Sequence, residues 1–126
     1  MEVSGGSALA VSEYALDARA YNEDYESVTW AECTLRGWLN GEFYDTAFNE
    51  EEKGRIALTE VENADNPEYG TEGGEDTEDR VFLLSLEEAD RYFEDDEDRR
   101  AFPTEYAIAK HAYMNSDLGT VWWWLR

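Results

Sequence analysis

The chain has 126 residues, of which 42% are hydrophobic and 33% are charged. That length suits a single domain, and the apolar fraction is large enough for a core, which argues against a disordered chain. The 31 acidic residues outnumber the 10 Lys and Arg, so the formal net charge is -21. Such a charge argues against binding to nucleic acid or anionic membranes, which need clustered basic residues.

The rare residue types narrow the chemistry further. Cys33 is the single cysteine and His111 the single histidine, which excludes an intrachain disulfide and any Cys- or His-rich metal site. No segment is long and apolar enough to span a bilayer, and the first residues lack the regions of a signal peptide. We therefore expect no membrane insertion, and a cytoplasmic location for the chain as written.

The first third of the chain predicts a strand followed by a helix. Residues 8–16 have the apolar content of a strand after a Gly-Gly turn. Thr29 and Glu32 have the spacing of a capping box, in which each side chain binds a backbone N–H of the first helical turn. The predicted helix places three residues roughly on one face: Trp30, Cys33 and Trp38. We expect it to end at Asn40 and Gly41, because Gly is preferred just past a helix end.

The middle of the chain alternates short elements with a long loop. Residues 42–48 indicate a further helical turn, and Asn49 with Glu52 predicts the N-terminal cap of another. The β-branched residues in 56–61 favour a strand. The segment 63–80 has no apolar periodicity, and loops of this length in compact domains are usually functional or mobile.

The last third predicts two helices between two strands. Residues 81–84 indicate a short buried strand, and Ser85 with Glu88 forms a second capping box at the start of a helix. Thr104 is expected to begin the last helix. The segment 121–126, Val-Trp-Trp-Trp-Leu-Arg, is predicted to be a terminal strand. Short strands, short helices and long loops together indicate an α+β fold.

The terminal strand contains three consecutive tryptophans, a large aromatic area for an acidic protein to expose. Alternation along a strand places Trp122 and Trp124 on one face and Trp123 on the other. Trp30, Trp38 and Trp122 have the spacing of core residues, whereas Trp123 is open to either role. We expect the edge of this strand to pair with a second copy and give a homodimer.

Five segments together resemble a known family. Two are distinctive: Thr-Trp-x-x-Cys-Thr-Leu-Arg-x-Trp-Leu-Asn at 29–40, and Trp-Trp-Trp-Leu-Arg at 122–126. The other three lie at 43–48, 79–85 and 103–107. In this order they resemble a bacterial domain of unknown function, the DUF6273-like domains common in gut Firmicutes and Actinobacteria. The resemblance covers nearly the whole chain.

The resemblance implies a C-type-lectin-like α+β fold, with short helices packed on a small, mostly antiparallel sheet and with long irregular loops. Formylglycine-generating enzymes, which modify sulfatases, and the variable proteins of diversity-generating retroelements use that fold. Members of the family usually begin with further strands and continue past Trp-Leu-Arg. We therefore expect residues 1–126 to be a single but incomplete domain, and the family context suggests a place at the cell surface.

The long loop suggests a calcium site. Calcium binds about six to eight oxygens from carboxylates, amides and carbonyls on flexible backbone. The loop supplies five candidate ligands: Asp65, Asn66, Glu75, Asp76 and Asp79. Their spacing does not match an EF-hand. The alternative interpretation is a solvated acidic loop whose Gly and Asn-Pro residues set turns.

The sequence offers little for catalysis. Cys33 lies inside a predicted helix of an acidic chain, whereas catalytic thiols need an electropositive setting. Formylglycine-generating enzymes would also need a pair of active cysteines. His111 has Glu105 or Asp117 as a possible acid–base partner, but a His near a helix end commonly just complements the helix dipole. We therefore predict no catalytic residues.

A binding surface is the better-supported function. We predict a non-catalytic module that binds a protein or a glycan around the terminal aromatic strand, since amphipathic aromatics give contact area at low entropic cost. The residues expected to contact the ligand are Tyr69, Trp123, Trp124 and Arg126. Arg36 and Arg126 are interpreted first as structural, through forked bonds to carboxylates or stacking on rings. The alternatives are a structural or adhesion module of a larger bacterial surface protein, or a degenerate relative of sulfatase-modifying factors.

Overall fold

The computed structural model describes residues 2–126. The chain divides into two compact units: unit 1 contains Met1–Arg19 and Glu87–Trp123, and unit 2 contains Ala20–Leu86 and Trp124–Arg126. The protein is a small mixed α/β structure of short helices and two-stranded ladders, so the predicted mixture of elements is confirmed at that level. Among the described residues, no helix is long and apolar enough to cross a membrane.

Unit 2 begins with four short helical segments: α1 (Thr34–Trp38), the π-helix η1 (Leu39–Phe43), α2 (Tyr44–Ala47) and α3 (Glu50–Lys53). Its buried core cluster contains Trp30, Cys33, Leu35 and Leu39. The capping box of Asn49 and Glu52 is present at the start of α3, as predicted. The Thr29 hydroxyl also donates to the Glu32 carboxylate (3.3 Å), but these residues form a turn, and α1 begins only at Thr34.

The predicted helix end at Asn40 and Gly41 is wrong, because the chain continues there as η1. The Asn40 side chain attaches this turn to another part of unit 2. Its amide donates to the Val81 carbonyl (2.8 Å), and its oxygen accepts the backbone N–H groups of Arg80 (2.7 Å) and Val81 (3.1 Å). Gly41 does not adopt the left-handed conformation of a helix stop. These tertiary bonds override the local stop signal.

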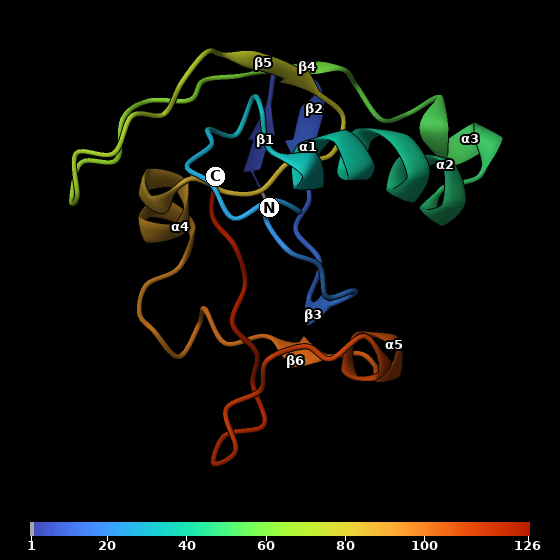
Figure 1. Ribbon diagram of the computed structural model, residues 1–126. Coiled ribbons are helices and arrows are strands. Elements are labelled where there is room, and N and C mark those ends of the chain that lie inside the picture. The colour runs from blue at the N-terminus through green and yellow to red at the C-terminus, as the bar shows by residue number, and fades with distance from the viewer. Residues whose placement is uncertain (1) are drawn as a thin grey trace. The chain divides into compact units, whose positions relative to one another are not determined.

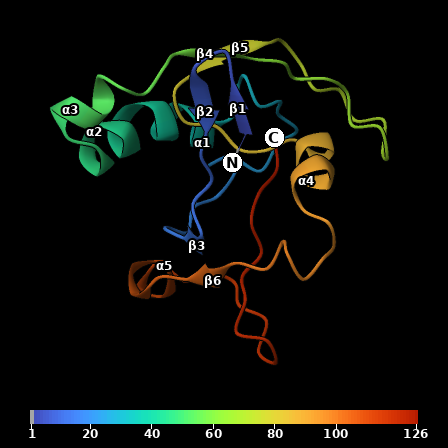
Figure 2. The ribbon, with the colours of Figure 1, turned by 180° about the vertical axis from the view of Figure 1, so that it is seen from behind.

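The predicted loop 63–80 is confirmed over residues 63–76, whereas Thr77–Asp79 form a strand. Strand β4 (Thr59–Val61) pairs antiparallel with β5 (Thr77–Asp79), which lies inside the segment predicted to be loop. Residues 62–76 between them form a long finger, which Figures 1 and 2 show extending away from α1, α2 and α3. At its tip the Asn66 N–H donates to the Thr71 carbonyl (2.8 Å), which closes a turn.

The strand predicted at residues 81–84 is absent, and the local strand lies earlier, at β5. Several backbone groups of this segment bind side chains or the chain terminus instead of a neighbouring strand. The Arg126 guanidinium donates to the Leu83 carbonyl (2.6 Å), and the Arg126 N–H donates to the Leu84 carbonyl (3.0 Å). The apolar side chains of 81–83 still pack against the core cluster. The prediction that this segment packs against the core was right, but its predicted secondary structure was wrong.

The described part of unit 1 contains two ladders and two helices. Its elements are β1 (Glu2–Ser4), β2 (Ser7–Leu9), β3 (Tyr14–Ala15), α4 (Leu86–Tyr92, which begins at the unit boundary), β6 (Phe102–Pro103) and α5 (Glu105–Ala109). Strands β1 and β2 pair antiparallel, whereas β3 and β6 pair parallel. The predicted strand 8–16 is therefore split between β2 and β3. Helix α4 begins directly after Ser85, and α5 begins after Thr104, whose hydroxyl accepts the Ala107 N–H (3.1 Å).

Residues 121–126 do not form the predicted strand. Val121 alone makes β-bridges, to Ala101 and Met114. Trp122 is exposed, so its prediction as a core residue is wrong. The reason is that only Val121 of this segment is paired, and the Trp122 side chain points away from the side on which Val121 is buried. The continuous strand edge on which the predicted homodimer rested is absent from the described structure.

The turn that ends α5 gives a prediction about stability. His111 follows the helix with φ = 64°, in the left-handed region where a side chain costs free energy. Replacing His111 with Gly is expected to raise the free energy of unfolding by about 0.5–1 kcal/mol, because Gly adopts this conformation without strain. The matched control, Ala109→Gly in the last helical residue, should lower it by about 0.5–1 kcal/mol. Urea denaturation measures both, and equal signs would contradict the interpretation.

Candidate functional site

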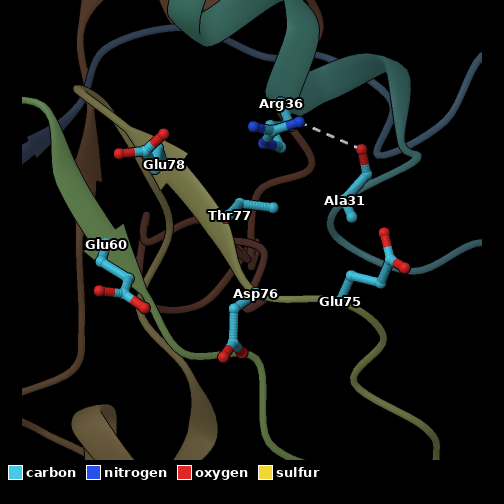
Figure 3. Close-up of a pocket in the computed structure, with 7 residues that line it drawn as sticks. All are labelled: Ala31, Arg36, Glu60, Glu75, Asp76, Thr77 and Glu78. Atoms are coloured by element: carbon cyan, nitrogen blue, oxygen red, sulfur yellow. Dashed lines mark hydrogen bonds between the residues drawn. The ribbon is translucent and has the colours of Figure 1, made fainter.

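A cavity of unit 2 lies beside the β4–β5 ladder and has a volume of about 650 Å³ (Figure 3). Seven residues line it: Ala31, Arg36, Glu60, Glu75, Asp76, Thr77 and Glu78. In the view of Figure 3, Arg36 lies on one side of the opening and Asp76 on the other. No aromatic or long aliphatic side chain is among the seven. We call this cavity the acidic pocket.

A buried carboxylate, Asp79, supports one wall of the acidic pocket. Its side chain has no exposed surface, and it accepts three hydrogen bonds. The donors are the Trp30 indole N–H (2.9 Å), the Thr77 hydroxyl (2.7 Å) and the Arg36 Nε–H (2.8 Å). Arg36 also donates to the Ala31 carbonyl (3.2 Å). The structural role predicted for Arg36 is confirmed, and its charge is matched by Asp79.

With Arg36 matched by Asp79, the remaining charges of the pocket are four exposed carboxylates. Glu60 and Glu78 stand directly opposite each other in the β4–β5 ladder. Like charges in directly opposed positions destabilise a sheet. Glu75 and Asp76 follow on the finger side, where the Asp76 carboxylate accepts the Asn63 N–H (2.9 Å). The site is therefore suited to a cationic group.

The residues predicted to bind calcium are only partly brought together. Glu75 and Asp76 line the acidic pocket, while Asp79 is buried behind it. Asp65 accepts the Gly73 N–H within the finger (3.0 Å), and Asn66 accepts N–H groups of its own turn. Within residues 2–126, no three acidic, His or Cys side chains form a group that could hold a metal ion. Calcium binding stays a prediction.

The predicted ligand-contacting residues have different roles. Trp123 packs in unit 1, where its indole N–H donates to the Arg99 carbonyl (2.9 Å) and its ring lies 6.1 Å from that of Phe93. Trp124 is exposed in unit 2 and makes an edge contact with Tyr21, with 5.7 Å between ring centroids. Tyr69 is exposed on the finger.

Arg126 fastens the last residues to unit 2. Its guanidinium donates to the Asn63 side chain (3.1 Å) and to the carbonyls of Leu83 (2.6 Å) and Glu62 (3.2 Å). It also lies over the Phe82 ring, 5.6 Å from the centroid. The structural role predicted for Arg126 is therefore confirmed, while direct contact with a ligand stays a prediction.

Two exposed aromatic residues were missed by the sequence analysis. Tyr113 and Trp122 are each 77% exposed and lie on either side of the turn at Asn115–Gly119. The turn signal of an Asn followed by a Gly four residues later was visible in the sequence. It would have indicated a hairpin, with these two aromatics facing each other across it.

Cys33 lies in a setting that favours the neutral thiol. It is buried, and its thiol donates to the Trp30 carbonyl (3.3 Å). Burial raises the pKa of the Cys33 thiol, and burial also raises the pKa of the neighbouring Tyr21 hydroxyl. A thiol with a raised pKa is a poor nucleophile at neutral pH.

A family model matches nearly the whole of the chain. Residues 5–126 match the family described as a domain of unknown function, DUF6273. The chain belongs to the DUF6273 family. No curated protein and no solved structure matches it. Because the family has no assigned function, the function of this DUF6273 domain has to be argued from the two units themselves.

Proposed function

We propose that this DUF6273 domain is a non-catalytic binding module whose acidic pocket takes a basic side chain of a protein ligand. The observation that carries the proposal is the cross-strand pair of Glu60 and Glu78, both of which line the pocket. This arrangement costs stability in the free protein, and such violations of local rules are expected at functional sites. A cation placed between the two carboxylates would relieve their repulsion.

The arrangement of the carboxylates supports a basic side chain over a metal ion, because no three acidic, His or Cys side chains of the described residues form a metal-binding group. Calcium needs about six to eight oxygens within about 2.3–2.6 Å, whereas an ammonium or guanidinium group binds well to one or two carboxylates. The acidic pocket offers four carboxylates spread around about 650 Å³. None of the seven lining residues is aromatic, whereas the glycan site that we predicted would contain aromatic side chains. The lining therefore also favours a protein ligand over a glycan.

The C-type-lectin-like architecture is part of this proposal. It is supported by the antiparallel pairing of β4 with β5, the short helices beside them and the long finger between the two strands. In such a fold, loops supply the binding site while strands and helices hold them in place. The acidic pocket combines both parts: Glu75 and Asp76 come from the finger, while the other lining residues come from β4, β5, α1 and the turn before α1.

The test compares two variants with the same change of charge. Glu60→Gln/Glu78→Gln alters the pocket, and Glu68→Gln/Glu72→Gln alters the finger outside it. A short peptide with two Lys or Arg residues serves as the probe in isothermal titration. We expect the pocket variant to bind it about tenfold more weakly and to be more stable by about 0.5–1 kcal/mol. The finger variant should retain most of the binding.

Three outcomes would contradict the proposal. Equal weakening by both variants would mean that overall charge, not the acidic pocket, attracts the peptide. Full binding by the pocket variant would place the site elsewhere. The third outcome is that calcium raises the melting temperature, that a matched monovalent salt does not, and that the pocket variant no longer shows the rise. That result would assign the pocket to a metal ion.

A further inference from the structure

A short hairpin in unit 1 displays two aromatic side chains. Its two arms are joined by the Met114–Val121 bridge and by hydrogen bonds from Asn115 N–H to the Thr120 carbonyl (2.8 Å) and from Trp122 N–H to the Tyr113 carbonyl (3.3 Å). Gly119, with φ = 70°, helps to close the turn. This register places Tyr113 and Trp122 side by side on one face of the hairpin, and each is 77% exposed.

A second aromatic pair lies on the neighbouring ladder of the same unit. Tyr14 in β3 is directly opposite Phe102 in β6, and the two are 49% and 52% exposed. Val121 of the hairpin bridges to Ala101, the residue before β6, through a hydrogen bond of 3.0 Å. Side chains alternate along each strand, so Phe102 and Trp122 both point away from the face that carries Ala101 and buried Val121.

These four residues, Tyr14, Phe102, Tyr113 and Trp122, form what we call the aromatic face. A Phe, Tyr or Trp side chain buries about 150–250 Å² when it is fully covered, so the exposed fractions of these four residues leave about 500 Å² on the face. Two copies packed through it would bury about 1,000 Å², which reaches the lower limit of specific interfaces. A patch of this size is also at the upper end of what a monomer exposes.

The charge distribution shows where two copies can approach. The whole chain carries -21, which opposes self-association through most of its surface. Residues 99–116, which contain two members of the aromatic face, hold three basic residues and one acidic residue, a net charge of +2. The basic residues are Arg99, Arg100 and Lys110, and the acidic residue is Glu105. Arg99 and Arg100 are paired with Asp90 (2.6 Å) and Glu97 (3.4 Å), so this stretch is close to neutral once these pairs are counted. Contact here therefore meets less repulsion than contact between two acidic regions would.

We propose that the aromatic face is the docking surface for a second copy of this chain, in a two-fold symmetric dimer. A two-fold axis brings the same patch of each copy together, which suits a single apolar face on each chain. Trp and Tyr at the centre of the patch have the residue types that dominate binding free energy in interfaces. The inference is independent of the acidic pocket, which lies in the other unit.

Sedimentation equilibrium of the full chain, over a range of concentrations at low and high NaCl, tests this proposal. We expect a monomer–dimer equilibrium that shifts toward dimer as salt screens the acidic surfaces. Trp122→Ala/Tyr113→Ala should weaken dimerisation about tenfold or more. Tyr25→Ala/Tyr69→Ala, which removes two exposed aromatics of unit 2, should leave it unchanged.

The outcomes separate this proposal from other kinds of association. A monomer at every concentration and salt condition would overturn it, as would equal weakening by both double variants. Masses above a dimer would overturn the two-fold arrangement. Trp122→Glu is a second variant, which should abolish the dimer at an exposed position while circular dichroism shows a folded chain. The pocket variant Glu60→Gln/Glu78→Gln should dimerise like the unmodified chain, so each proposal can fail separately.

Discussion

Replacing Asp79 with Ala is expected to lower the free energy of unfolding by about 3–5 kcal/mol. The Asp79 carboxylate is fully buried and joins three donors: Trp30, Thr77 and Arg36. Its removal leaves the Arg36 charge without its buried partner and the Trp30 N–H and Thr77 hydroxyl without their acceptor. A loss of this size is comparable to the whole stability of many small domains.

Urea denaturation followed by tryptophan fluorescence measures this loss, since Trp30 is buried beside Asp79. Asp79→Asn keeps an acceptor but removes the charge, so it should cost less than Asp79→Ala. The matched control is Asp45→Ala, which breaks an ion pair of 3.2 Å between Lys53 and an exposed carboxylate. That change should cost no more than about 1 kcal/mol. Similar losses for Asp79→Ala and Asp45→Ala would show that the buried network is not a main support of unit 2.

The second large effect is expected at Arg126. Changing it to Ala should lower the free energy of unfolding by about 2–3 kcal/mol, because hydrogen bonds to charged groups are stronger than neutral ones. The lost bonds run to Asn63, Glu62 and Leu83, which come from two separate segments of unit 2. The contact over the Phe82 ring is lost as well. Arg126 therefore holds the last residues of the described chain onto the unit.

Two comparisons identify the reason for the loss. Arg126→Lys keeps the charge but not the planar fork, so we expect it to recover less than half of the stability. Arg55→Ala removes an Arg whose ion pair with Glu51 is exposed on both sides and should cost no more than about 1 kcal/mol. If Arg126→Lys had the full stability of the unmodified chain, the charge alone would matter. If Arg126→Ala left the urea midpoint unchanged, Arg126 would not hold the last residues onto unit 2.

Local sequence signals succeeded where the stabilising contacts are themselves local. The capping box of Asn49 and Glu52 and the cap at Thr104 need only residues a few positions apart, and both are present in the structure. Residues 29–40 and 122–126 also carried enough of the pattern to indicate the family, which the match over residues 5–126 confirms.

Local sequence signals gave wrong predictions where backbone groups bind side chains that are distant in the sequence. Gly41 is a reasonable helix stop in isolation, but Asn40 binds Arg80 and Val81, and the helical path continues. Residues 81–84 have the composition of a strand, yet their carbonyls bind Asn40 and Arg126 side chains. Hydrogen bonds between residues that lie about 40 positions apart leave no recognisable pattern in a single sequence.

The sequence by itself therefore determined the acidic character, the mixed α/β class, the family and the local helix caps. It also identified Glu75 and Asp76 as candidate site residues. Only the tertiary structure placed Glu60 opposite Glu78, because strand register depends on pairing between segments far apart in the chain. It likewise decided that Trp122 is exposed and Trp123 is packed. The two residues are of the same type, so only the local backbone pairing and the surrounding side chains distinguish them.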